Sequence, residues 1–382
     1  MACGHSFPVP SMHSVAHSIV LQSGDAGNQP VAEDPAWRFS SLRCAWMMLA
    51  QLPLVYFTFN PVQMNFNERL NVAVQSMSEQ DRKRVVDYVK TVASSEGEIP
   101  KTAHPHIFEL LPTHRLPGAV FGYRSWDHWW MAVVSLVGFL ILLAVLFRSP
   151  MYRMKHVIGA SVFTGSAGIL MLLLFQSISL RRNSLSEDVS YALVKELIAF
   201  SYTAALDPRS GFGWSLVGFT FGVGLCEEVC KLIPLYWNFR KKRTLDWSGA
   251  FAWGFASGAG FGVSEGVFYG FSFYNGYSTA EVYWVRFVSC VALHAIWSGT
   301  AGVSLWKRQD QIQKLAGRWS AFFTVVSITF WPMFLHGLYD TFLKKNMQWE
   351  ALATALLSVF WMAWSVETAT RYERKLDVVV AV

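Results

Sequence analysis

Four apolar stretches in the second half of the chain carry side chains that could do acid–base chemistry. In chain order these side chains are Glu227, Glu228 and Lys231, then Glu265, then His294, and finally His336 and Asp340. Ionisable groups at membrane depth are costly and usually functional. A shielded carboxylate can act as a general base on water while imidazoles share the proton. Alternatively, glutamate and histidine can ligate a divalent metal that activates the water.

Spacing brings several of these side chains onto the same helical face. Glu227 and Lys231 are one turn apart and can pair, as can His336 and Asp340. Asp340 would then orient the imidazole of His336 and select its tautomer. Glu228 is rotated by about 100° from Glu227, so only one of the two glutamates need face the same cavity.

The elements that must position these residues are membrane-spanning helices. The chain has 382 residues, of which 53% are hydrophobic and 15% charged, against about 25% charged in a soluble domain. Seven apolar runs approach or exceed the length of about 20 residues that spans a bilayer. They are residues 129–147, 157–178, 212–237, 249–271, 285–305, 321–343 and 351–366. We therefore expect an all-α, polytopic membrane helix bundle with seven or eight transmembrane helices.

The eighth candidate span is residues 44–59, which are short for a membrane helix. This segment could be a membrane helix, an uncleaved signal-anchor or a cleaved signal peptide, and we favour the membrane helix.

The chain is predicted to divide into four regions. Residues 1–36 are polar and lack apolar periodicity, which predicts a disordered N-terminus. Residues 37–127 hold the candidate first membrane helix and a small external helical region. Residues 128–368 form the multi-span bundle, and residues 369–382 form a cytoplasmic tail.

Basic residues indicate the orientation of the bundle. Arg and Lys concentrate after the first, third, fifth and seventh strong spans, which places these alternate loops and the C-terminus in the cytoplasm. The pair Lys344–Lys345 on the other side is a small exception. Because the net charge of +6 is carried largely by such loops, it indicates topology and contact with the lipid bilayer, and no nucleic-acid partner.

The polar residues lie at comparable depths. At a rise of about 1.5 Å per residue, Glu227 lies about 15 Å, Glu265 about 24 Å, His294 about 17 Å and His336 about 23 Å from the cytoplasmic ends of their spans. The hydrocarbon core is about 30 Å thick. Four successive spans with acids or imidazoles at such depths favour one shared cavity over four separate structural roles.

The span that carries Glu265 also has a stripe of glycines at every fourth position. The stripe consists of Gly254, Gly258, Gly262 and Gly266. Small residues let membrane helices approach closely, as a compact site would require.

The order of these motifs resembles the PrsW family of intramembrane proteases, which is distantly similar to CAAX-processing and bacteriocin-processing membrane proteases. Family members carry E-E-x-x-K, then an F-x-x-x-E(N) block, then His-bearing helices. The matching residues are Glu227-Glu228-Val-Cys-Lys231, Phe261-Gly-Val-Ser-Glu265, His294-Ala-Ile-Trp-Ser298 and His336-Gly-Leu-Tyr-Asp340. The resemblance covers about residues 211–343. The Asn that often follows the third Glu of the family is Gly266 here, a departure that bears on substrate positioning rather than on the base.

The resemblance implies cleavage of a membrane-anchored protein near its external face, in bacteria typically an anti-sigma factor. We predict an intramembrane endopeptidase, glutamate- or metal-dependent, in a bacterial plasma membrane, with a single-span membrane protein as substrate. The predicted catalytic residues are Glu227, Glu228, Glu265, His294 and His336, with Lys231 and Asp340 in support. If the enzyme uses a divalent metal such as zinc, the candidate ligands are Glu265, His294 and His336.

Two functions from other classes fit the same residues. A proton- or ion-coupled transporter would bind ions at mid-membrane acids and histidines, and inverted repeats, of which none is obvious, would favour it. A catalytically inactive scaffold would capture membrane helices without cleaving them.

Overall fold

The computed structural model describes residues 35–60, 65–94, 99–147, 149, 152–180, 189–241, 245–314 and 317–380. Within these ranges the chain forms helices and no strands, which confirms the all-α prediction. The predicted disordered N-terminus lies outside the described residues, apart from residues 35 and 36, which begin the first helix.

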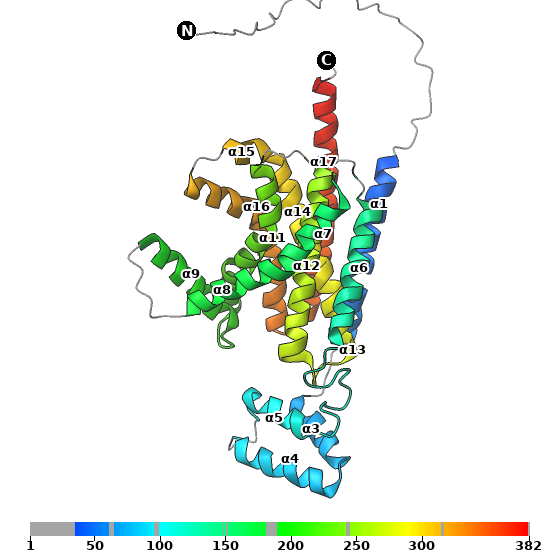
Figure 1. Ribbon diagram of the computed structural model, residues 1–382, viewed down its shortest axis with the longest axis vertical. Coiled ribbons are helices and arrows are strands. Elements are labelled where there is room, and N and C mark those ends of the chain that lie inside the picture. Colours follow the sequence, from blue (N-terminus) through cyan, green and yellow to red (C-terminus); the bar gives the residue numbers. More distant parts are fainter. Residues whose placement is uncertain are drawn as a thin grey trace, which may run out of the picture.

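The first helices form a candidate span and a small helical region. They are α1 (Pro35–Leu49), α2 (Leu52–Phe59), α3 (Phe66–Gln75), α4 (Glu79–Val92), η1 (Lys101–Ala103) and α5 (His104–Leu110). Helices α3 to α5 lie together at one end of the molecule, whereas α15 and the C-terminal end of α17 lie at the other (Figure 1).

The remaining helices form the bundle. They are α6 (His128–Leu146), α7 (Met154–Phe163), η2 (Thr164–Gly168), α8 (Ile169–Leu180), α9 (Val189–Leu206), α10 (Phe212–Gly218), η3 (Phe219–Gly224), α11 (Leu225–Arg240), α12 (Trp247–Tyr269), η4 (Gly270–Tyr274), α13 (Ala280–Trp284), η5 (Val285–Cys290), α14 (Val291–Lys307), α15 (Gln309–Lys314), α16 (Arg318–Lys344) and α17 (Gln348–Val380).

Five of the described helices are long and apolar enough to cross a membrane. They are His128–Leu146, Met154–Leu174, Ala280–Lys307, Trp319–Lys344 and Gln348–Glu373. The pair Ser41–Leu49 and Leu52–Phe59, bent by 42°, makes a sixth if it is counted as one span. The predicted spans 212–237 and 249–271 are not in this set, since charged residues in α11 and glycines in α12 lower their mean hydropathy.

Helix α12 lies at the centre of the bundle and packs against α6, α7, α11 and α14 (Figure 1). Its glycine stripe faces α14: a Cβ at Gly254 or Gly258 would collide with the backbone carbonyl of Ser298 or His294. A Cβ at Gly266 would lie 2.8 Å from the ring of Phe287. The stripe therefore sets the close approach of α12 and α14, as its small residues predict.

Four π-helical segments, η2 to η5, interrupt the helices of the bundle. Such segments occur often at functional sites, because the extra residue in a turn rotates the side chains that follow. Segment η3 ends three residues before Glu227, and η5 contains Arg286. The interruptions therefore lie next to the polar residues of the bundle.

The small helical region is joined to the bundle by backbone hydrogen bonds between two loops. Leu116 N–H donates to the carbonyl of Gly276 at 2.8 Å, and Gly276 N–H donates to the carbonyl of Phe121 at 2.9 Å. Gly276 has φ +80°, a conformation that favours glycine. This turn holds α3 to α5 against the loop between η4 and α13.

Candidate active site

Lys231 is the centre of a buried polar cluster. Its Nζ contacts Glu228 Oε1 at 2.8 Å, Glu227 Oε2 at 3.2 Å and His294 Nδ1 at 2.8 Å. The side chain of Lys231 is fully buried, and its Nζ lies 4.5 Å from the ring centroid of Phe261. Lys231 thus offsets the charge of both glutamates, and the first residue of the F-x-x-x-E block covers it.

His336 on α16 joins the same cluster from the opposite side. Its Nδ1 lies 3.2 Å from Glu228 Oε1, and its Nε2 lies 3.4 Å from Asp340 Oδ2 and 3.7 Å from Glu227 Oε2. The ring stacks on Trp297 with a centroid distance of 4.7 Å. The pairing with Asp340 expected from their spacing is present, and Glu228 contacts the other ring nitrogen.

Glu265 has partners that its local sequence does not indicate. Its Oε2 lies 2.5 Å from Arg286 Nη2 and 2.9 Å from His294 Nε2. The Arg286 guanidinium also lies 4.7 Å from the ring centroid of Tyr269. Sequence reasoning missed Arg286, although an arginine inside the apolar run 285–305 was a signal of the kind that marks intramembrane function.

A wide cavity of about 970 Å³ adjoins the cluster. Its polar wall includes Glu227, Glu265, Arg286, His294, His336 and Asp340. Glu228 is buried behind this wall and is not among the lining residues, so of the two adjacent glutamates only Glu227 faces the cavity. This arrangement agrees with the rotation of about 100° between the two side chains, which requires only one of them to face the cavity.

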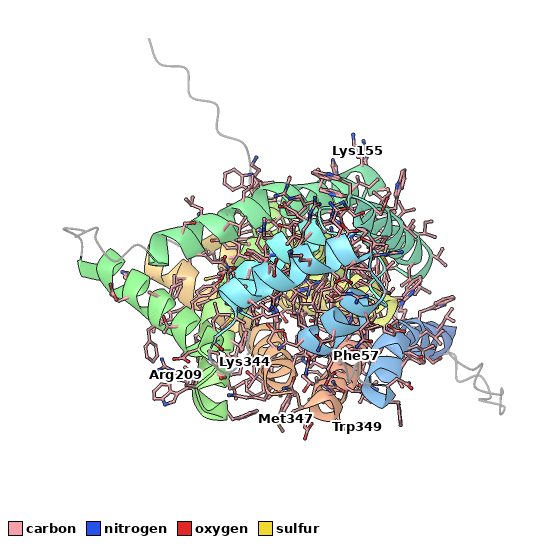
Figure 2. All side chains as sticks on the ribbon, turned by 90° about the horizontal axis from the view of Figure 1, so that it is seen from below. Phe57, Lys155, Arg209, Lys344, Met347 and Trp349 are labelled. Atoms are coloured by element: carbon pink, nitrogen blue, oxygen red, sulfur yellow. The ribbon has the colours of Figure 1, made fainter. Side chains whose placement is uncertain are left out.

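The other walls of the cavity are largely apolar and lead toward the end of the bundle that carries the small helical region. Leu172, Leu173, Phe268 and Phe273 line its sides. Residues at this end of the bundle also line it, among them Phe57, Lys344, Asn346 and Gln348. Figure 2, which views the molecule from this end, shows Phe57 and Lys344. The cavity therefore extends from this end of the bundle to the polar wall.

Three residues of the polar wall could hold a metal ion. Glu227, His294 and His336 each offer one ligand atom, and these atoms lie within 4.8 Å of one another. The predicted ligand candidates were Glu265, His294 and His336; in this group Glu227 takes the place of Glu265, whose carboxylate contacts Arg286.

The donor set suits a catalytic zinc ion. Two imidazoles and one carboxylate are an established zinc ligand set, and the adjoining cavity leaves room for a water or substrate ligand. The described cluster also holds four carboxylates against two cations, which leaves an excess of negative charge when all are ionised. A divalent cation would balance that charge.

Residues 152–366 match the family model described as PrsW family intramembrane metalloprotease. This match covers more than half of the chain. The chain belongs to the PrsW family. No curated protein and no solved structure matches it. This PrsW-family protein is therefore an integral membrane protein and an intramembrane peptidase, as the motifs predicted, and its substrate is a membrane protein in a lipid bilayer.

Gly262 of the PrsW-family protein supports the ring of His294 directly. A Cβ at Gly262 would lie 2.8 Å from His294 Cδ2, so Gly262→Ala must displace the imidazole. We expect the substitution to lower proteolytic activity by about 10- to 100-fold, since small misplacements of reacting groups have effects of this size. The measurement is the initial rate of reporter cleavage at equal amounts of folded enzyme.

Gly159→Ala on α7 is the matched control, because no atom lies within 4 Å of the added Cβ. Alanine favours helix over glycine by about 1 kcal/mol, so neither variant is weakened by helix propensity. Equal activity of both variants and wild type would contradict a role for Gly262 in placing His294.

Proposed function

We propose that this protease cleaves a single-span membrane protein near its external face by means of water activated beside Glu227, His294 and His336. One observation supports this most strongly: acids and imidazoles from α11, α12, α14 and α16 meet on one wall of a cavity with apolar sides. Such a cavity suits a helix that must enter from lipid and present one peptide bond to a polar wall. The bacterial plasma membrane and an anti-sigma factor as substrate are part of this proposal through the family resemblance.

Glu227 is the group that we assign as general base when no metal is bound, and as a ligand when a metal is bound. It faces the cavity, contacts Lys231 and lies 3.7 Å from His336 Nε2, so in the metal-free route a proton taken from water can pass to this imidazole. Glu228 stays buried behind it and holds Lys231 and His336 in place. In this arrangement Glu228 is a positioning residue.

Zinc is the metal that we propose for the site, held by Glu227, His294 and His336. When bound, such an ion supplies a Lewis acid and eases deprotonation of water. Glu265 and Arg286 keep His294 oriented through the contact at its Nε2 side. Because the arginine offsets the Glu265 charge, this carboxylate can stay ionised among apolar helices.

The proposed topology has seven or eight spans, with α11 and α12 crossing the membrane inside the bundle and the C-terminus in the cytoplasm. Burial inside the protein lets these two helices be less apolar than the lipid-facing ones, because other helices satisfy their polar groups. In this orientation the small helical region and the mouth of the cavity are external.

A transporter would need access to the site from both sides. Among the described residues, the lining includes members of α16 and the α16–α17 turn near Lys344 and none from the loops at the end that carries α15. Because a transporter opens to one side at a time, this access fits either class in a single conformation, and the family match favours hydrolysis over transport.

Metal removal tests the proposal. Full-length enzyme in detergent, treated with a strong chelator, is expected to cleave a single-span reporter at least about a hundredfold more slowly, because a metal that activates water lowers the barrier by several kcal/mol. Added zinc should restore the rate. The control is reporter cleavage by a soluble serine protease in the same chelator. A rate that stays unchanged after the protein is shown by elemental analysis to be metal-free would contradict the metal-dependent route.

A further inference from the structure

A second, smaller pocket of about 210 Å³ lies where the small helical region meets the end of the bundle. Its lining residues come from α2, α3, α13 and the loop before it, the turn between α16 and α17, and the start of α17. They are Phe57, Arg69, Tyr277, Ser278, Thr279, Val282, Asn346 and Gln348. Most of these side chains are polar, in contrast to the apolar walls of the active-site cavity.

Arg69 is the unusual member of this lining. Only 3% of the residue is exposed, its Nε donates to the Pro117 carbonyl at 3.0 Å, and its guanidinium lies 5.0 Å from the ring centroid of Tyr277. Its Nη2 is buried and has no hydrogen-bond partner, and no carboxylate of the described chain forms an ion pair with it. A buried cation without an anion is costly, so an anion in the pocket would offset the charge of Arg69.

The pocket adjoins the active-site cavity. Four lining residues belong to both: Phe57, Val282, Asn346 and Gln348. A polypeptide that reaches Glu227 from this end of the bundle therefore passes the guanidinium of Arg69. Asn346 and Gln348 add amide groups, which can donate to the oxygens of an anion.

We propose that Arg69 and its neighbours form a subsite for a side-chain carboxylate of the substrate, on the segment that leaves the substrate's membrane span on the side of the small helical region. The inference rests on the proposed function, since it takes the occupant to be the substrate. A guanidinium matches a carboxylate through two parallel N–H donors. A lipid headgroup fits less well, since none of the lining residues is among the exposed large apolar side chains that would contact lipid.

The test measures binding rather than cleavage. Full-length protein carrying Glu227→Gln is mixed in detergent with fluorescent single-span reporters. The reporters form pairs: one member has a single Glu at a position that flanks the span, and the other has Gln at the same position. Successive pairs move this position along the flanking segment. We expect the Glu reporter to bind about 10-fold to 100-fold more tightly than its Gln counterpart at one or two neighbouring positions, the range expected of a hydrogen bond to a charged group. Adding Arg69→Gln should bring this ratio close to one.

Using the ratio of two reporters cancels any loss of folded protein in the Arg69→Gln variant. Arg84→Gln on the exposed side of α4 is the matched control and should leave the ratio unchanged. If Arg69→Gln lowers the affinity for both reporters equally, the ratio of the two affinities stays as in the protein with Arg69. That result would show that Arg69 has only a structural role and would overturn the proposal. Arg69-dependent binding of phosphatidylglycerol in nanodiscs, with no preference between reporters, would assign the pocket to lipid and overturn it too. If wild type cleaves no reporter but the Arg69-dependent ratio is present, the proposed proteolysis fails and the subsite stands.

Discussion

Glu227→Gln is expected to lower reporter cleavage by about a thousandfold or more, because it removes the cavity-facing carboxylate, which is the general base without a metal and a ligand with one. The fold should survive. Glutamine has nearly the same shape, and the 2.8 Å contact between Lys231 and Glu228 remains to balance charge. The measurement is kcat/KM for a single-span reporter, with folded protein quantified by size-exclusion chromatography.

Two further variants sharpen this result. Glu367→Gln makes the same chemical change on α17, where Glu367 forms an exposed pair with Arg371, and it should leave cleavage unchanged. Glu228→Gln should lower cleavage less than Glu227→Gln, since Glu228 does not line the cavity. A greater loss for Glu228→Gln than for Glu227→Gln would reverse the roles that we assign to them.

Lys231→Met is expected to destabilise the protein by about 3–5 kcal/mol, the usual consequence of leaving a buried charge uncompensated. Lys231 contacts both Glu227 and Glu228, and its side chain is fully buried. Removing the ammonium group therefore leaves two adjacent carboxylates without their cation. The measurement is the unfolding free energy in detergent micelles, followed by helical circular dichroism.

A second substitution distinguishes the loss of charge balance from the loss of side-chain packing as the cause of this destabilisation. The double variant Lys231→Met with Glu228→Gln removes one charge of each sign and should recover a large part of the lost stability. Lys307→Met is the matched control, because Lys307 makes an exposed contact with Thr368. A double variant less stable than Lys231→Met would mean that the cluster is held by its geometry and not by its charge balance.

Much of the site was predictable because it follows from local sequence. The i, i+4 spacing alone predicted that Lys231 contacts Glu227 and that Asp340 contacts His336, since a helix fixes those distances. The glycine stripe predicted a close helix contact for the same reason, and in the structure it faces α14. Motif order predicted the family, and the match over residues 152–366 confirms it.

Other features depend on how helices are rotated against one another. Glu228 and Glu227 are neighbours in sequence, yet only the packing of α11 against α16 shows which of them faces the cavity. Arg286 lies in the π-helical segment η5 and contacts Glu265 on α12, a partner that no local spacing indicates.

By itself the sequence determined that this is a helical membrane protein with ionisable groups on successive helices, because the cost of placing charge in an apolar run is a local property. Only the tertiary structure decided that Glu227, and not Glu265, joins the two histidines in one metal-sized group, and that Arg69 is buried without an anion. Those facts require the distances between helices far apart in the chain. Such distances arise from the close packing of all side chains together, which no single stretch of sequence encodes.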